Sequence, residues 1–188
     1  MSRTASSNKQ LQSLHTSNQL SNQVVKESIE TAFILLLENN RNEQITISDI
    51  VRKAGVSRMA YYRNYNSKEE ILDSYMRTNW KTVQEAISPY AGMDDPLSCW
   101  TTLFSTIQQF VNSYLVLLNA GMGETILRFI DELFVELIPN DSNSAPVLSH
   151  FWSGATYNVL SEWIRTGMQQ PPHKMAEIFC SIYSDSLR

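Results

Sequence analysis

The sequence contains 188 residues, of which 43% are hydrophobic, and its formal net charge is −4 at pH 7. A chain of this length and composition can bury one substantial core and has room for a small second unit. No apolar run approaches the roughly 18 residues that suggest a membrane span, and the N-terminal segment lacks the apolar centre of a signal peptide. We therefore expect a soluble globular protein in the cytoplasm.

The charged residues are unevenly distributed along the chain. Residues 1–81 carry 11 Lys or Arg and 8 Asp or Glu, a balance of +3, whereas residues 82–188 carry 4 and 11, a balance of −7. A local basic excess on an acidic chain indicates a surface that binds a polyanion, because the local field attracts such a partner. Ordinary surface scatter stays open as the alternative when charge is considered alone.

The first elements are a polar tail and an amphipathic helix. Residues 1–20 are rich in Ser, Asn, Gln and Thr and contain no acidic residue, so we expect a disordered polar tail there. Apolar residues then recur at helical spacing, which predicts a helix over residues 21–40.

Two short helices joined by a glycine turn are predicted next. Thr46 and Asp49 have the form of a capping box that opens the first of them. This helix ends before Gly55, because glycine adopts the left-handed conformation without a steric penalty. Ser57 caps the second helix, which runs to about Arg63. Two short helices separated by about three residues that include glycine are typical of a helix-turn-helix.

A longer helix connects this region to the rest of the chain. Ser67 and Glu70 form another capping box, and the helix ends at Pro89. The predicted organisation is a helix-turn-helix DNA-binding domain over residues 21–66, a connecting helix over 67–88 and a regulatory and dimerisation domain over 89–188.

The C-terminal region is predicted to be helical throughout. Asp95 followed by Pro96 is a typical N-cap and first-turn pair. The apolar stretch from Leu97 to Leu118 fits one kinked helix or two short ones. No stretch shows sustained strand-like alternation, so the fold is expected to be all-α with eight or nine helices. The remaining helices are predicted over residues 122–138, 146–168 and 172–187.

Basic and aromatic residues are concentrated in residues 45–72. This segment holds five Lys or Arg, three carboxylates and three tyrosines. The second helix of a helix-turn-helix lies in the major groove of DNA, where Arg58 and Arg63 can reach phosphates or a guanine edge. Lys68 and the backbone N–H groups of the next helix can hold a phosphate, although an exposed lysine without this role is the alternative.

The segment TISDIVRKAGVSRMAYYRNYNSKEEIL resembles the DNA-binding signature of the TetR family of transcriptional regulators. In that signature an Ala-Gly-Val-Ser turn leads into an aromatic-Tyr-Arg-x-aromatic run and then into a Ser-Lys capped helix. The closing segment GATYNVLSEWIRTGMQQPPHKMAEIF is similar to the last two helices of such proteins. The resemblance implies an N-terminal three-helix helix-turn-helix DNA-binding domain followed by a C-terminal helical ligand-binding and dimerisation domain.

The resemblance also implies roles for individual residues. Arg58 and Met59 stand where the recognition helix begins to face bases, and Tyr61 and Tyr65 stand at positions that are usually core aromatics. The sequence departs from the common pattern at Met59, often a small residue, and at Ala60, often threonine, which removes one polar contact to DNA. Positions that commonly touch phosphates are matched by Thr46, Ser57, Tyr62 and Lys68.

Family members generally dimerise through their last two helices and bind a small molecule inside the C-terminal domain. The resemblance therefore implies a homodimer, a palindromic double-stranded DNA operator and a small-molecule effector. Two sets of apolar residues are candidates for the dimer interface and for the ligand pocket. For both sets, packing in the protein core is the alternative. Candidate interface residues are Trp152, Tyr157, Leu160, Trp163 and Ile164. Candidate ligand-pocket residues are Trp100, Phe104, Phe110, Tyr114, Met122 and Phe129.

Other classes of function have less support. The three histidines are scattered, and the sequence contains no Gly-rich phosphate loop, no GxSxG and no metal-ligand spacing, so we expect no catalytic site, metal or cofactor. Cys99 and Cys180 are expected to be buried, reduced thiols. A helical adaptor that keeps the fold but binds a protein remains an alternative to a DNA-binding repressor released by an effector.

Overall fold

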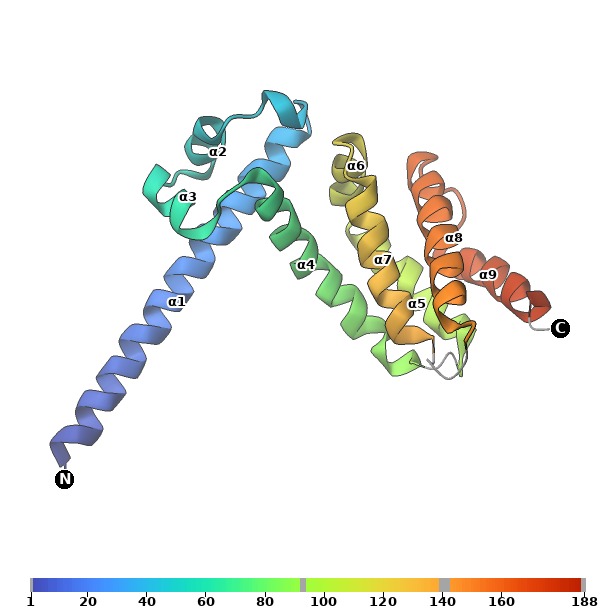
Figure 1. Ribbon diagram of the computed structural model, residues 1–188, viewed down its shortest axis with the longest axis horizontal. Coiled ribbons are helices and arrows are strands. Elements are labelled where there is room, and N and C mark those ends of the chain that lie inside the picture. Colours follow the sequence, from blue (N-terminus) through green and yellow to red (C-terminus); the bar gives the residue numbers. More distant parts are fainter. Residues whose placement is uncertain (1, 92–93, 139–142, 187–188) are drawn as a thin grey trace. The chain divides into compact units, whose positions relative to one another are not determined.

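The computed structural model describes residues 2–91, 94–138 and 143–186, and it describes side chains over residues 19–182 outside the same gaps. This part of the chain contains nine α-helices, two short 3₁₀ helices and no strand (Figure 1), which confirms the all-α prediction. No helix in it is long and apolar enough to cross a membrane. The chain divides into two compact units, Met1–Tyr75 and Met76–Arg188.

The helix bounds follow the predicted ranges closely from residue 46 onward. The boundary between the units falls within α4, inside the predicted connecting helix. Residue 187, where the last helix is predicted to end, lies outside the described residues. In chain order the elements are α1 (Ser2–Leu37), η1 (Asn42–Gln44), α2 (Ile47–Ala54), α3 (Arg58–Asn64), α4 (Lys68–Ile87), η2 (Ser88–Tyr90), α5 (Pro96–Gln109), α6 (Val111–Asn119), α7 (Gly123–Leu137), α8 (Ala145–Arg165) and α9 (Pro172–Ser186).

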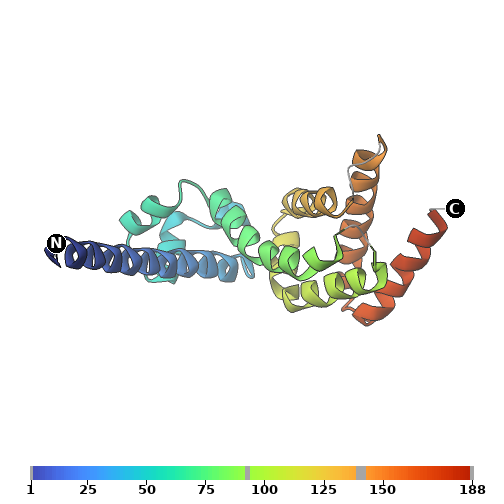
Figure 2. The ribbon, with the colours of Figure 1, turned by 90° about the horizontal axis from the view of Figure 1, so that it is seen from below.

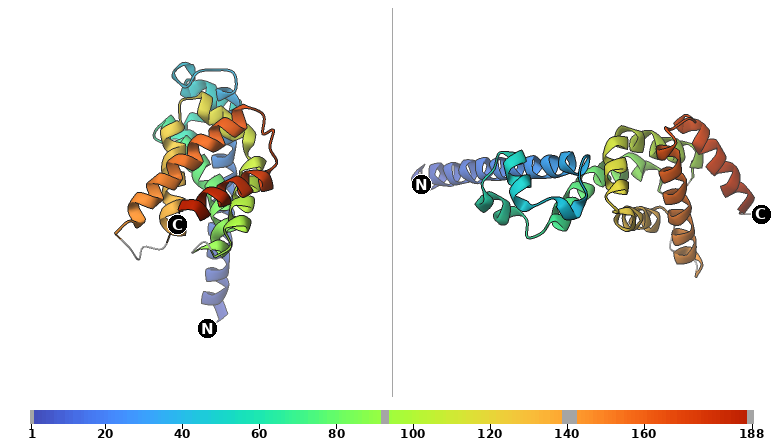
Figure 3. Two further views of the ribbon diagram at one scale, coloured as in Figure 1. Left: turned by 90° about the vertical axis from the view of Figure 1, so that its right-hand side faces the viewer. Right: turned by 90° about the horizontal axis from the view of Figure 1, so that it is seen from above.

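The first helix is longer than the sequence predicts. α1 begins at Ser2 and so includes the segment 2–20 that was expected to form a disordered tail. No Gly or Pro occurs before Leu37, so no residue interrupts the helix, although Ser, Asn and Thr have low helix propensity. Within the N-terminal unit, α1 extends past α2 and α3 toward its N-terminal end (Figure 2 and Figure 3).

The predicted caps fix the ends of α2 and α3 in the N-terminal unit. Asp49 N–H donates to Thr46 Oγ1 at 3.2 Å, and Thr46 N–H donates to Asp49 Oδ2 at 3.1 Å. Gly55 ends α2 with a φ of 68°, and Ser57 Oγ accepts a hydrogen bond from the N–H of Ala60 at the start of α3. These contacts confirm the capping box, the glycine turn and the serine cap. The unit buries an apolar core that includes Ile29, Phe33, Ile50, Tyr61, Tyr65, Ile71 and Leu72.

The C-terminal unit is built around a cluster of aromatic rings. α5 packs on α9 and α7 packs on α8. The ring centroid of Trp100 lies 4.6 Å from that of Phe179 and 5.7 Å from those of Phe134 and Trp152. Burial of such large rings contributes strongly to the stability of a core. Of the two cysteines predicted to be buried, Cys99 is buried and Cys180 is half-buried.

Candidate functional site

One face of α3 is exposed and carries the side chains that the sequence assigns to DNA contact. Met59 is 71% exposed and Tyr62 is 55% exposed, whereas the neighbouring Tyr61 is 0% exposed. Tyr61 and Tyr65 lie in the core, which confirms the prediction made for them. The edge of one ring meets the face of the other in the Tyr61–Tyr62 pair, with centroids 5.2 Å apart. We call the exposed residues the α3 face: Arg58, Met59, Tyr62 and Arg63.

A buried carboxylate joins three segments of the same unit. Glu30 of α1 is 7% exposed, and its Oε1 accepts hydrogen bonds from Tyr65 Oη and Ser74 Oγ, each at 2.6 Å. Burial raises the pKa of Tyr65, and the hydrogen bond to Glu30 raises it further by a smaller amount, so the Tyr65 hydroxyl remains a donor. This network connects α1 with α4 and with the residue that ends α3. In the sequence, the only signal of this network is a glutamate next to Ile29, a core position.

Lys68 is engaged with the backbone of its own unit. Its half-buried side chain donates hydrogen bonds through Nζ to the carbonyl oxygens of Asn42 and Ile45, the latter at 3.0 Å. A lysine at a helix N-terminus is disfavoured by the helix dipole, and these two carbonyls offset that cost. Since an ammonium group has three donors, one remains for a phosphate. Lys68 thus fastens the α1–α2 connection to the first turn of α4, a role that the sequence did not indicate.

The start of α2 is connected to α3 by polar contacts. The guanidinium of Arg58 donates a hydrogen bond to Ser48 Oγ. Thr46 Oγ1 donates to Asp49 Oδ2 at 2.6 Å, and Arg52 Nη2 lies 2.7 Å from Asp49 Oδ1. The hydrogen bonds from Thr46 lower the pKa of Asp49 and keep its carboxylate ionised. The negative charge of Asp49 is therefore paired with Arg52.

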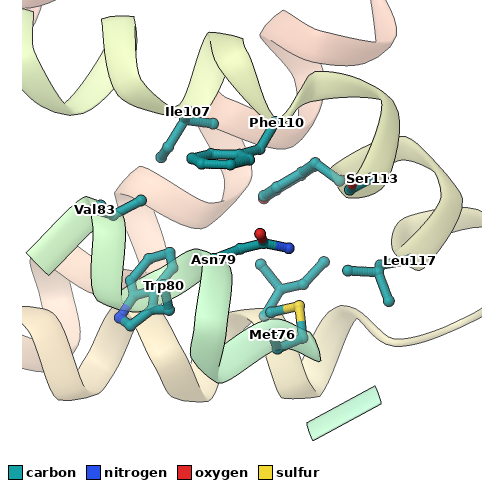
Figure 4. Close-up of a pocket in the computed structure, with 10 residues that line it drawn as sticks. Met76, Asn79, Trp80, Val83, Ile107, Phe110, Ser113 and Leu117 are labelled. Atoms are coloured by element: carbon teal, nitrogen blue, oxygen red, sulfur yellow. The ribbon is translucent and has the colours of Figure 1, made fainter. Parts of the chain in front are cut away.

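A cavity lies in the C-terminal unit between α4, α5, α6 and α7 (Figure 4). Its empty volume is about 420 Å³, including the part open to solvent. Figure 4 shows the amide of Asn79 directed toward apolar side chains from the other helices. Burial raises the pKa of Tyr114 to about 12, and its Oη lies 3.2 Å from Ser161 Oγ. No charged residue lines the cavity, which is formed by Met76, Asn79, Trp80, Val83, Ile107, Phe110, Ser113, Tyr114, Leu117 and Ile126.

Among the predicted ligand-pocket residues, Phe110 and Tyr114 line this cavity. Trp100 and Phe104 belong to the aromatic core, and Met122 is half-buried at the start of α7. Phe129 packs against Trp80 with ring centroids 6.0 Å apart. The α4 residues that line the cavity were not predicted, because that helix was interpreted from the sequence only as a connecting helix. Their signal was present, since Met76, Trp80 and Val83 follow helical spacing.

The predicted interface residues of α8 are mostly core residues. Trp152, Leu160, Trp163 and Ile164 are at most 5% exposed, and Tyr157 is half-buried. Trp163 Nε1 donates to the Gln170 carbonyl at 2.8 Å. Core packing was the alternative for these side chains, and it accounts for the four buried ones. In this structure they are not available to a second subunit. Other large apolar side chains of α7, α8 and α9 are exposed: Val135, Val147, Leu148, Phe151, Ile178 and Ile182.

Within the described residues, no group of three or more His, Cys, Asp or Glu is arranged to hold a metal ion. Residues 94–185 match a TetR family model described as a transcriptional regulator C-terminal region. The match includes α5 to α8 and nearly all of α9. A comparison with curated proteins gave no match. Through its C-terminal region, the chain belongs to the TetR family of transcriptional regulators.

Proposed function

We propose that the protein is a homodimeric, sequence-specific DNA-binding repressor that leaves a palindromic operator when a small-molecule effector binds its C-terminal unit. The observation that carries this proposal is the α3 face, where two arginines, a methionine and a tyrosine are exposed together on one short helix. Exposed large side chains of this kind are typical of a binding surface, and the second of two short helices joined by a turn is the element that enters the major groove.

Each residue of the α3 face has a chemical role in this docking. Arg58 and Arg63 supply donors for phosphates or for the O6 and N7 atoms of guanine. Met59 can press on a thymine methyl group, and Tyr62 can donate its hydroxyl to a phosphate. Because Arg58 also donates to Ser48, its guanidinium is oriented before DNA arrives. Further phosphate contacts come from Ser57 and the third donor of Lys68. The hydroxyl of Thr46 donates to Asp49 Oδ2 and would exchange that acceptor for a phosphate oxygen when DNA binds.

The cavity of the C-terminal unit is the proposed effector site. Its lining is almost entirely apolar and contains no charged residue, so it suits a neutral, largely apolar molecule with one group that hydrogen-bonds to Asn79. Four of its residues, including Asn79, lie on α4, and the first residues of α4 belong to the DNA-binding unit. A ligand that displaces these side chains would therefore act on the helix that leads to the α3 face.

The exposed apolar residues of α8 and α9 are the proposed dimer surface. Val147 and Phe151 are separated by one helical turn, as are Ile178 and Ile182, and all four are exposed. Large exposed apolar patches usually mark protein interfaces. In a two-fold dimer the two α3 faces must bind half-sites about 34–36 Å apart, so a modest shift of α4 is enough to weaken operator binding.

A selection from a random duplex library with the purified protein, followed by titrations at two salt concentrations, tests this function. We expect a palindromic consensus and an affinity that falls steeply with salt, because phosphate contacts release counterions. Enrichment of no site by a folded dimer would overturn the proposal and favour the adaptor that binds a protein. Screening small molecules for release of the selected duplex then tests the effector step.

A further inference from the structure

A polar groove lies beside the α3 face in the N-terminal unit. It runs between residues 19–25 of α1 and the C-terminal part of α3, and its empty volume is about 1050 Å³, including the part open to solvent. Most of its residues carry hydrogen-bond donors, and none of them carries a carboxylate. The groove is lined by Gln19, Ser21, Asn22, Val25, Ala60, Arg63 and Asn64.

The part of α1 that precedes the groove has an unusual charge composition for this acidic chain. Residues 1–26 contain Arg3, Lys9 and Lys26 but no Asp or Glu. α1 continues from the groove back to Ser2, which adds about 25 Å of helix at 1.5 Å per residue. These turns lie beyond α3 within the same unit (Figure 1 and Figure 2).

We propose that the groove and the preceding turns of α1 bind the sugar-phosphate backbone of DNA that flanks the site read by α3. The inference rests on the proposed function and extends it from the α3 face to a second DNA-contacting element. Amide, hydroxyl and guanidinium groups are those that proteins use to hold phosphate and sugar oxygens. The lack of carboxylates removes the repulsion that an acidic helix would suffer beside a polyanion. Arg63 belongs to both surfaces, which makes them continuous.

Flank length is the variable that separates this element from the α3 face. The wild-type chain is titrated with two duplexes, one limited to the selected palindrome and one with about ten additional base pairs, roughly one helical turn, on each side. We expect the longer duplex to bind more tightly, because only it reaches the extension of α1. Equal affinities for the two duplexes would overturn the inference while leaving the proposed function intact.

Charge variants test the extension directly. R3Q/K9Q should weaken binding to the long duplex on the order of tenfold, and should make the salt slope shallower by about two to four, because each phosphate contact contributes about 0.9 to that slope. R3K/K9R should bind as the wild type does. The charge-matched control K81Q/K174Q removes two exposed cations from the other unit and should also bind normally. Wild-type affinity and slope for R3Q/K9Q would contradict the inference.

The groove is tested with uncharged substitutions. Q19A/N22A should weaken binding to the long duplex several-fold, whereas Q23A should not, because Gln23 is exposed on the same helix but does not line the groove. Light scattering of R3Q/K9Q tests whether the N-terminal turns of α1 form a protein interface instead of binding DNA. A change of oligomeric state would assign these turns to a protein interface and overturn the inference. Failure of the wild-type chain to bind any duplex would overturn the proposed function and this inference together.

Discussion

Different kinds of contact stabilise the interior of each of the two units. In the N-terminal unit, directional hydrogen bonds join segments that are distant in sequence, with Glu30 accepting from Tyr65 and Ser74 and Lys68 donating to two backbone carbonyls. In the C-terminal unit, the helices meet largely through aromatic rings grouped around Trp100.

The difference suits the work proposed for each unit. A hydrogen bond requires a particular direction as well as a distance, so the polar network holds the α3 face in one geometry, as a surface that reads base edges requires. Apolar packing has no such directional requirement, and cores tolerate repacking when their volume is kept. A unit of that kind can contain a cavity and adjust to a ligand. The following substitutions test this contrast.

The largest effect is expected from Trp100→Ala in the aromatic cluster. The substitution removes a ring that contacts four other rings and should lower the free energy of unfolding by about 3–5 kcal/mol. Chemical denaturation followed by tryptophan fluorescence measures it. The control is Leu97→Ala, an exposed position on the same helix, which should change stability by less than about 0.5 kcal/mol. Similar losses in both variants would refute a core centred on Trp100.

A smaller loss is expected from Glu30→Ala in the polar network. The buried hydroxyl of Tyr65 and the half-buried hydroxyl of Ser74 would lose Glu30 as their acceptor, which should cost about 2–3 kcal/mol. Glu30→Gln keeps an acceptor oxygen and should lose less. All four tryptophans belong to the C-terminal unit, so circular dichroism should detect unfolding of the N-terminal unit before tryptophan fluorescence changes. Unaltered stability of Glu30→Ala would show that the network does not hold the unit together.

Adjacent tyrosines provide the next comparison. Tyr62→Ala should weaken operator binding by about tenfold, the order expected for losing one phosphate contact in each subunit, and should leave the melting temperature unchanged because Tyr62 is exposed. Tyr61→Ala should instead destabilise the unit, because that ring is buried. Band-shift titration and thermal melting of both variants measure the two effects. Normal DNA binding by Tyr62→Ala would remove Tyr62 from the docking surface.

Local signals in the sequence predicted the helix ends well, since each depends on residues only a few positions apart. Thr46 with Asp49, Gly55, Ser57 and Asp95 all act as predicted. The short range of these contacts explains their success, because a cap hydrogen bond forms within one turn whatever the rest of the chain does. Arg58, Met59, Tyr62 and Arg63 were assigned from the helix-turn-helix pattern and the family resemblance, and all four side chains are exposed.

Contacts between distant segments could not be predicted in the same way. The Glu30 bonds join residues 35 and 44 positions apart, and no spacing rule connects them. On α8, helical periodicity placed Leu160 and Ile164 on one apolar face but did not indicate which neighbouring helix covers that face. The α4 residues of the cavity were missed for a related reason, since Met76 and Trp80 lie on a helix whose second packing partner is visible only in three dimensions.

The smallest effect is expected at Ala60, where the sequence departs from the family pattern. Ala60→Thr would add a hydroxyl to a half-buried position that lines the polar groove, and one additional neutral hydrogen bond of about 0.5–1 kcal/mol corresponds to binding tightened a few-fold. Ala60→Val has nearly the same shape without the hydroxyl and is the matched control, because it includes the helix cost of β-branching. If the two variants bind the selected operator equally well, residue 60 does not contact DNA. Tighter binding by Ala60→Thr alone would show that the N-terminal unit holds this position close enough to DNA for a single hydroxyl to matter.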